Sequence, residues 1–239
     1  MTLLSVENLT KSFGGVTACN SVGATINAGE IVGLIGPNGA GKTTFLNLIS
    51  GYFRPTCGSI HFQDRSLVGL KPSQICRLGI ARTHQVVKPF GNLSVYKNIE
   101  VGAFLRSHSK RDLHERVENV LELTKLTDLK DKVARELPLT MRKRLEIARA
   151  VATGPSFLLL DEAMAGLNPS ELDPAIELVQ ELKKRGITLL VIEHIMKVIM
   201  SISERILVLV EGRLIADDKP KAVASNPQVI KAYLGESRA

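Results

Sequence analysis

The sequence predicts an α/β fold built on a parallel β-sheet. Short apolar runs, each the length of a buried strand, alternate along the chain with stretches of helical periodicity. A glycine or a polar residue follows directly after several of these runs, at Gly36, Gln85, Asp161 and His194. In sheets of this kind, ligands bind at the carboxyl ends of the strands. We therefore expect these residues to gather at one edge of the sheet and to form a site.

Composition narrows the possible classes of protein. The chain has 239 residues, of which 44% are hydrophobic, which is enough for one large domain with a sizeable core. No apolar run approaches the roughly 18 residues of a membrane-spanning helix, and the first residues lack the basic and apolar segments of a signal peptide. Basic and aromatic residues are not interleaved as they are in single-strand binders. We expect a cytoplasmic protein that does not bind nucleic acid.

The most informative stretch is a glycine-rich turn between an apolar strand, residues 31–35, and a helix that starts near Lys42. It contains the pattern G-x-x-x-x-G-K-[ST], which is typical of loops that bind nucleotide phosphates. Glycines allow backbone N–H groups to close around an anion, and the helix start adds further donors. Lys42 is expected to reach the terminal phosphates, and the Thr43 hydroxyl is expected to bind Mg²⁺. The predicted nucleotide-binding residues are Gly36, Pro37, Asn38, Gly39, Ala40, Gly41, Lys42, Thr43 and Thr44.

The segments around this loop predict a second, antiparallel sheet. Residues 3–9 alternate in hydrophobicity, residues 17–26 form another extended stretch, and residues 58–62 add a third. Phe13 lies in the turn after the first of these strands. Its ring could stack on a nucleobase or could anchor the turn in the core, and the residue type fits both roles.

Residues 71–155 are predicted to form a mostly helical lobe, inserted into an α/β core that comprises residues 1–70 and 156–239. Pro72 begins a short helix that ends at residue 78, Ser94 caps a second helix, and residues 110–126 carry apolar side chains at helical spacing. Residues 79–84 form a short strand ending at Gln85, and a helix from Met141 ends before a Gly-Pro pair.

Beyond the lobe, strands and helices alternate again. The pattern predicts apolar strands at residues 157–160 and 188–192, and the helix between them, residues 170–185, ends at a glycine. Residues 206–210 and 214–216 form a hairpin, and a last short helix starts at residue 225 or 226 and ends near residue 234.

Polar residues at the strand ends supply the chemistry of a nucleotide-hydrolysing site. Asp161 is placed to bind Mg²⁺ opposite Thr43, and Glu162 beside it could act as general base for an attacking water. Gln85 could complete the Mg²⁺ shell or orient water, and His194 could hydrogen-bond the γ-phosphate. Taken alone, a glutamine or a histidine at a strand end is more often structural, so both roles depend on the rest of the site.

The order of these motifs resembles that of the ATP-binding subunits of ABC transporters over essentially the whole chain. The segment GPNGAGKTT matches the family's phosphate loop and GIARTHQ its Q-loop. FLLLDE matches the Walker B strand with its catalytic glutamate, and VIEH matches the strand that ends in the switch histidine. Phe13 falls where the family places an aromatic residue that stacks on adenine.

The resemblance implies a P-loop NTPase core of the RecA-like type, with an antiparallel β subdomain and an inserted helical subdomain that carries the Q-loop and the signature region. It also implies a head-to-tail dimer, in which each ATP lies between the phosphate loop of one subunit and the signature sequence of the other, and which drives a membrane partner. The cofactors implied are ATP and Mg²⁺. The catalytic residues implied are Lys42, Gln85, Glu162 and His194, and the Mg²⁺ ligands are Thr43, Gln85 and Asp161.

The sequence departs from the family at the signature. Where the family has Leu-Ser-Gly-Gly-Gln, this chain has Leu137, Pro138, Leu139, Thr140 and Met141. Proline lacks an N–H group and leucine adds bulk where backbone must approach the partner's ATP, although Thr140 could still offer a hydroxyl. Asn168 replaces the family's D-loop aspartate. We predict that the chain hydrolyses ATP poorly as a homodimer and pairs with a paralogous subunit that has an intact signature.

Within the family, GIARTHQ, the opening KSFGGVTA and DEAMAGLNP resemble the ATPase subunits of branched-chain amino-acid importers, which use two different ATPase chains. Urea and amide importers, lipopolysaccharide exporters and a catalytically weak regulatory ATPase are the alternatives. The resemblance implies transmembrane permease partners and a peripheral position at the cytoplasmic face of the inner membrane. A permease is expected to dock near Phe90, Leu93 and Tyr96, unless these side chains belong to the core of the lobe.

Two other classes of protein fit less well. Soluble ABC-type ATPases of DNA repair or translation usually carry two nucleotide domains or long coiled-coil insertions, for which 239 residues leave no room. Small-molecule kinases need an acceptor pocket and lid arginines, and GTPases need an Asn-Lys-x-Asp motif that the sequence lacks.

Overall fold

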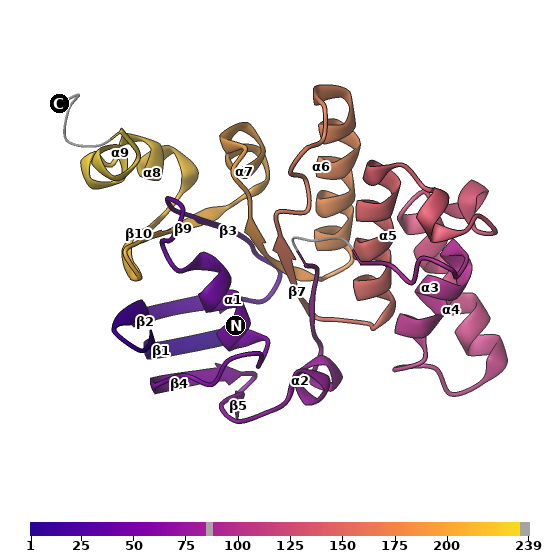
Figure 1. Cartoon of the computed structure of the whole chain (residues 1–239), viewed down its shortest axis with the longest axis horizontal. Coiled ribbons are helices and arrows are strands. Elements are labelled where there is room, and N and C mark those ends of the chain that lie inside the picture. The colour runs from indigo at the N-terminus through magenta and orange to yellow at the C-terminus, as the bar shows by residue number, and fades with distance from the viewer. Residues whose placement is uncertain (85–87, 235–239) are drawn as a thin grey trace. The chain divides into compact units, whose positions relative to one another are not determined.

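The computed structural model describes residues 1–84 and 88–234. The chain packs as two compact units, one of Met1–Ile75 with Thr188–Ala239 and one of Cys76–Ile187. Strands and helices alternate along the chain as predicted (Figure 1). The second unit contains most of the predicted helical lobe together with residues 156–187, and the limits of the lobe itself, residues 71–155, stay a prediction.

An antiparallel sheet occupies the start of the first unit. Its strands are β1 (Thr2–Phe13), β2 (Val16–Asn27), β4 (Cys57–Phe62) and β5 (Arg65–Ser66), in the order β2-β1-β4-β5. Figure 1 shows β1, β2 and β4 side by side towards the indigo end of the chain. Alternate residues such as Leu4, Val6 and Ile60 are buried, and the residues between them are more exposed. The predicted antiparallel sheet is therefore confirmed, with β1 and β2 longer than predicted.

A second sheet in the same unit holds the glycine-rich loop. β3 (Ile31–Ile35) pairs in parallel with β8 (Thr188–Ile192) and β9 (Arg205–Val210), and β10 (Arg213–Asp218) pairs antiparallel with β9. Every residue of β3 and β8 is buried, which explains why their sequences are apolar apart from Thr188 at the start of β8.

The helices of the first unit are α1 (Lys42–Ile49), α7 (Met196–Ile202), α8 (Pro220–Ser225) and α9 (Pro227–Leu234). The sequence pattern predicts α1 and α9 but not α7 and α8. These two helices have only 7 and 6 residues, too few to display a helical period.

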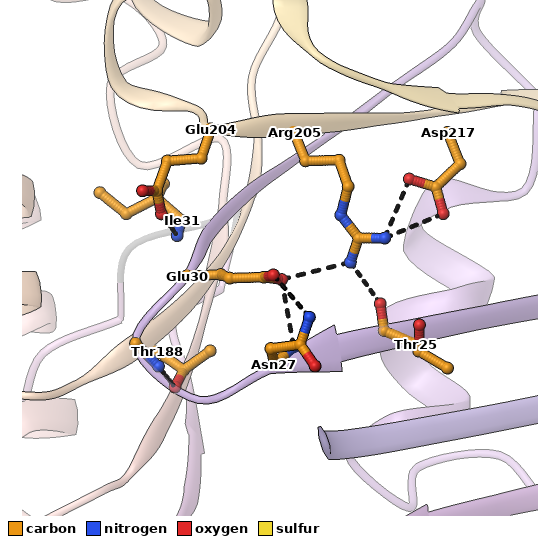
Figure 2. Close-up of polar contacts among 9 residues, drawn as sticks. Thr25, Asn27, Glu30, Ile31, Thr188, Glu204, Arg205 and Asp217 are labelled. Atoms are coloured by element: carbon orange, nitrogen blue, oxygen red, sulfur yellow. Dashed lines mark hydrogen bonds and ion pairs between the residues drawn. The ribbon is translucent and has the colours of Figure 1, made fainter. Parts of the chain in front are cut away.

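Arg205, at the start of β9, ties the two sheets of this unit together (Figure 2). Its guanidinium donates to both carboxylate oxygens of Asp217 at 3.1 Å, to Glu30 at 3.2 Å and to the carbonyl oxygen of Thr25. Glu30 also accepts hydrogen bonds from the backbone and side chain of Asn27, at 3.1 and 2.7 Å. Because Thr25 and Asn27 lie on β2 and Asp217 lies on β10, the network fixes one sheet to the other.

This network sets the charge state of its two carboxyl groups. Burial pushes the pKa of Glu30 up, but hydrogen bonds from Asn27 and the charge of Arg205 outweigh it, so the pKa lies below its ordinary value. Burial raises the pKa of Asp217, and Arg205 opposes that rise without cancelling it. The guanidinium therefore favours the ionised form of both groups, together with Asn27 in the case of Glu30.

Replacing Arg205 by methionine is expected to lower the free energy of unfolding by about 2–3 kcal/mol near neutral pH, because partly buried carboxylates lose their cation. The folded-state pKa of Glu30 is lowered, so its stabilising contribution is complete above its ordinary pKa of 4.5 and is lost as the pH falls below that value. The difference between wild type and variant should therefore shrink at about pH 4. Urea unfolding at about pH 7 and about pH 4 measures both effects.

The control for this prediction is Arg111→Met, which removes a strongly exposed arginine paired with Glu115. Surface pairs of this kind contribute about 0–1 kcal/mol, so the control should unfold like the wild type at both pH values. An Arg205→Met variant that matches the control, or whose destabilisation does not change with pH, would contradict the prediction.

The second unit combines two parallel strands with a group of helices. β6 (Ile80–Arg82) pairs in parallel with β7 (Phe157–Asp161). The helices are α3 (Val95–Ala103), α4 (Lys110–Leu123), α5 (Leu139–Ala152) and α6 (Pro169–Lys184), with short 3₁₀ turns at Thr127–Leu129 and Ala134–Glu136, and α2 (Pro72–Leu78) leads into the unit. α5 packs on both α3 and α4. All the helices predicted for this part of the chain are present.

Side-chain caps explain where two of these helices begin. Ser94, as predicted, accepts a hydrogen bond from the backbone N–H of Lys97 at 3.2 Å. Asn168 caps α6 in a capping box with Glu171.

Within the described ranges, no helix combines the length and apolar character needed to cross a bilayer.

Candidate active site

The phosphate loop, residues 36–44, comprises the turn of residues 36–41 after β3 and the first three residues of α1. Gly36 and Gly41 are the points where it approaches neighbouring backbone closely. A Cβ atom at Gly36 would overlap the carbonyl oxygen of Leu209, and one at Gly41 would overlap that of Ala18. Gly41 also has a φ of 100°, a left-handed conformation that favours glycine, and it is the N-cap of α1. Both glycines of the predicted pattern are therefore required by the fold itself.

Lys42 places a positive charge inside this loop. Only 7% of its surface is exposed, and Nζ donates hydrogen bonds to the carbonyl oxygens of Gly36 at 2.7 Å and Pro37 at 2.9 Å. A buried cation needs such bonds, because its burial is otherwise costly. The ammonium group thus lies among backbone dipoles at the N-terminus of α1, an environment that suits an anion such as a phosphate.

Two further predicted residues lie in the same unit. Thr43 is exposed on the first turn of α1. Phe13 keeps 43% of its surface exposed, so it is not a core anchor. Its ring packs edge-on against Phe53 with 5.1 Å between centroids, and Nζ of Lys11 lies 4.9 Å from its centroid. Base stacking by this half-exposed ring stays a prediction.

His194 follows β8 and is exposed. The structure also adds a residue that the sequence did not single out, Tyr233 on α9. Burial raises the pKa of its phenol, and a hydrogen bond with the backbone of Gly36 opposes that rise. The last helix therefore reaches the first residue of the phosphate loop.

In the second unit, Asp161 ends β7 as a buried carboxylate. It forms an ion pair with Arg82 of β6 at 2.8 Å, and the two side chains are only 3% and 7% exposed. The backbone N–H of Asp161 donates to the hydroxyl of Thr83 at 3.2 Å. The predicted magnesium ligand is thus held by two neighbours from the end of β6, and Arg82 was not among the predicted site residues.

Replacing Arg82 by methionine is expected to destabilise the protein by about 3–5 kcal/mol, because the Asp161 carboxylate stays buried without its partner. The double variant Arg82→Met with Asp161→Asn removes both charges and should regain most of that loss. Urea unfolding of the two variants beside the wild type measures the difference. Equal stabilities of the single and the double variant would show that the ion pair is not the cause.

Glu162, directly after Asp161, has a backbone φ of 50°, in the left-handed region that few non-glycine residues adopt. Its carbonyl oxygen accepts hydrogen bonds from Nζ of Lys143 and from the backbone N–H of Ala165, each at 3.2 Å. Nζ of Lys143 also donates to the carbonyl oxygen of Ala165. Lys143 belongs to a run of basic residues on α5, and its burial is visible only in the structure.

Glu146, one turn further along α5, is also buried. Its carboxylate accepts hydrogen bonds from the backbone N–H groups of His84 at 2.9 Å and Lys88 at 3.1 Å. Burial, helped by the charge of Arg82, lowers the pKa of His84.

Gln85 lies outside the described residues, so its predicted role in catalysis and Mg²⁺ binding stays a prediction.

The predicted signature region forms the approach to α5 and its first turn. Pro138 is the N-cap, and the helix begins at Leu139 rather than at Met141 as predicted. Leu139 keeps 47% of its surface exposed at this helix end. Thr140 donates its hydroxyl to the carboxylate of Glu171 on α6 at 2.5 Å. The hydroxyl that the sequence left available for a partner's ATP is therefore engaged within this chain.

Comparison with known proteins identifies the family. The family model described as "ABC transporter" matches residues 19–165. The high-affinity branched-chain amino acid transport ATP-binding protein LivG of Salmonella typhimurium is 41% identical over 98% of each chain. The chain belongs to the ABC transporter ATPase family. A second family model, described as "Branched-chain amino acid ATP-binding cassette transporter", matches residues 213–239 of this ABC ATPase.

Relatives and solved structures extend this assignment to the whole chain. BraF of Pseudomonas aeruginosa, another high-affinity branched-chain amino acid transport ATP-binding protein, is 39% identical over 98% of each chain. An ATP-binding cassette of an ABC transporter, solved in its ADP conformation, matches with a TM-score of 0.88 and 32% identity, over 99% of this chain and 100% of that one. A nucleotide-free ATP-binding cassette gives a TM-score of 0.89. The predicted P-loop NTPase fold and ATPase class of this ABC ATPase are confirmed.

Proposed function

We propose that this ABC ATPase binds and hydrolyses ATP to energise the import of branched-chain amino acids or related small polar solutes. The observation behind this cargo class is the match to LivG and BraF over nearly the full length, together with the match of residues 213–239 to the branched-chain amino acid transporter model. The geometry of the phosphate loop supports ATP binding by the chain itself.

ATP is proposed to bind with its phosphates in the loop of residues 36–44. Lys42 would exchange the carbonyl oxygens of Gly36 and Pro37 for phosphate oxygens, which carry more negative charge. Pro37, Asn38, Gly39, Ala40, Gly41 and Thr44 contribute the rest of the loop, and the half-exposed ring of Phe13 would stack on the adenine.

Mg²⁺ is proposed to bind to the Thr43 hydroxyl and the Asp161 carboxylate, with Gln85 as a further ligand. The donor set fits the ion, because all three side chains present the hard oxygen atoms that Mg²⁺ prefers. The ion pair with Arg82 supports the same assignment, since the carboxylate of Asp161 already lies 2.8 Å from a cationic group at the end of β7. When bound, the ion neutralises charge on the phosphates.

Glu162 is proposed to act as the general base that takes a proton from the attacking water. His194, exposed at the end of β8, would donate a hydrogen bond to the γ-phosphate and stabilise the charge that develops there.

The proposed partners are a second ABC ATPase subunit and transmembrane permease subunits. The signature region of this chain is a poor surface for a partner's ATP, because Pro138 has no N–H, Leu139 projects bulk and Thr140 is bonded to Glu171. A paralogue with an intact signature would complete the site formed by this chain's phosphate loop. The complex would lie at the cytoplasmic face of the inner membrane.

The permease is proposed to contact the loop before α3. Phe90 and Leu93 keep 44% and 39% of their surfaces exposed, so neither is a core residue of the second unit. The buried Asn98 fixes this loop, because its side chain bonds the N–H and carbonyl groups of Phe90 and the carbonyl oxygen of Leu93. Tyr96 is half-buried and hydrogen-bonded to His114 at 2.9 Å, which suits it less well for contact with a partner.

A tag on this chain, used to purify the membrane complex, tests the proposal. After reconstitution into vesicles, the complex should accumulate radiolabelled leucine in an ATP-dependent manner and should contain a second ATPase chain. Uptake of urea or short amides instead would reassign the cargo, and lipopolysaccharide as the only substrate would refute import.

The degenerate signature favours a second candidate, a catalytically weak regulatory ATPase. Steady-state ATP hydrolysis by the purified chain alone and by the complex separates the two proposals. The importer subunit is supported if the chain alone turns over ATP slowly and the complex turns it over at least roughly tenfold faster. Such a difference between complex and isolated chain requires a partner's signature. Slow turnover of both supports the regulatory role, and fast turnover of the chain alone contradicts the predicted need for a paralogue.

A further inference from the structure

A buried lysine on α5 holds the backbone of the residue proposed as the general base. Lys143 has only 9% of its surface exposed, and its Nζ donates to the carbonyl oxygens of Glu162 and Ala165. An ammonium group is costly to bury unless it is well hydrogen-bonded. The fold therefore places one of its few buried charges against the loop that follows Asp161.

The loop needs such a restraint because Glu162 adopts a conformation that side chains rarely adopt. At a φ of 50° the Cβ atom crowds the backbone, so the surroundings must hold the residue there. The Glu162 carbonyl oxygen accepts from both Lys143 and the backbone N–H of Ala165, which closes a tight turn. This backbone conformation sets the direction in which the Glu162 carboxylate leaves the strand.

The far end of the same loop is also fixed by α5. Asn168 caps α6 in a capping box with Glu171, and Glu171 accepts the hydroxyl of Thr140 from the first turn of α5. The loop from Glu162 to Asn168 is thus held at its start by Lys143 and at its end through Thr140. Both contacts come from the helix that carries the signature region at its N-terminus.

We propose that Lys143 is a positioning residue for Glu162, and that its contact with the Glu162 carbonyl keeps the carboxylate aimed for proton abstraction. This rests on the proposed role of Glu162 as general base. Lys143 itself does not touch ATP in this scheme. Lys143 links the base to α5, the helix that carries the signature region at its N-terminus. A displacement of the N-terminus of α5 therefore alters the geometry of the base.

The first test is kinetic and uses the purified transporter complex with Lys143→Met, which keeps the apolar stem and removes the donor. The turnover number should fall roughly ten- to hundredfold, as it does when a reacting group moves by about 1 Å. The KM for ATP should change by less than about twofold, since the phosphate loop is untouched. Lys143→Arg, which retains a cation and donors, should recover much of the loss.

The matched control is Lys184→Met, which removes a lysine of α6 that is 74% exposed and should leave both constants unchanged. Lys143→Gln, whose shorter side chain keeps an amide NH₂ but loses the positive charge, replaces the methionine variant if that variant does not fold. A turnover number unchanged in Lys143→Met, or a parallel change in turnover and KM, would overturn the proposal.

The second test separates this proposal from the role of Glu162. In a Glu162→Gln background, adding Lys143→Met should cause no further loss of the residual rate, because the base is already absent. Hydrogen exchange of residues 162–168 in the isolated chain should accelerate in Lys143→Met, with the phosphate loop unchanged. Additive kinetic losses, or unchanged exchange, would refute the role of Lys143. Full activity of Glu162→Gln would refute the general base, and the exchange result would still decide whether Lys143 fixes the loop.

Discussion

Glutamine in place of Glu162 is expected to lower the ATP turnover of the assembled transporter by roughly 10²- to 10⁴-fold, the range that a general base contributes. The amide has nearly the same size as the carboxylate but cannot accept the proton of an attacking water. The loss should be nearly complete, because the other composite site would contain the degenerate signature of this chain, where Thr140 is bonded to Glu171.

Phosphate release by the complex measures this effect, and binding of a fluorescent ATP analogue provides the second readout. Binding should stay within about threefold of wild type, since Lys42 and its loop are unchanged and only the catalytic step is lost. Glu177→Gln, which neutralises an exposed glutamate paired with Lys125, is the control and should hydrolyse ATP normally. Turnover above about a tenth of wild type in Glu162→Gln would exclude Glu162 as the base.

Alanine in place of Gly41 is expected to damage both folding and nucleotide binding. The left-handed φ of 100° costs an L-residue about 1–2 kcal/mol, and the added Cβ would overlap the backbone carbonyl oxygen of Ala18. Together these effects should lower the free energy of unfolding by about 3–5 kcal/mol. Because Gly41 is the N-cap of α1, its displacement also moves the N–H groups that would face a phosphate, and ATP affinity should fall at least about a hundredfold.

Gly29→Ala offers a matched control in the same unit. Gly29 has a φ of 81°, but a Cβ atom there would meet no other heavy atom within 4 Å. It therefore isolates the conformational cost, about 1 kcal/mol, and should leave ATP binding intact. Urea unfolding and titration with a fluorescent ATP analogue should rank the variants as wild type, Gly29→Ala and Gly41→Ala. Equal effects of the two substitutions would show that contact with Ala18 does not limit the loop.

Sequence patterns were sufficient wherever the residues that form a feature are neighbours along the chain. The phosphate loop is contiguous, so its glycines, Lys42 and Thr43 could be assigned their places before the structure was known. Strands buried on both faces need uninterrupted apolar residues, and β3 and β8 were therefore predicted with the bounds observed. The longer helices were predicted from spacing and caps, and the short α2 from Pro72 at its start, whereas α7 and α8 are too short to show a period and were missed.

Charged residues that support the site could not be identified in this way, because their partners are far away in sequence. Arg82 pairs with a carboxylate 79 residues later, Lys143 holds a carbonyl group 19 residues later, and Glu146 binds an N–H group 62 residues earlier. Nothing in the local pattern distinguishes these residues from the exposed charges beside them. Which charges become buried depends on how helices and strands pack, since packing alone removes their water and brings each one to a compensating group.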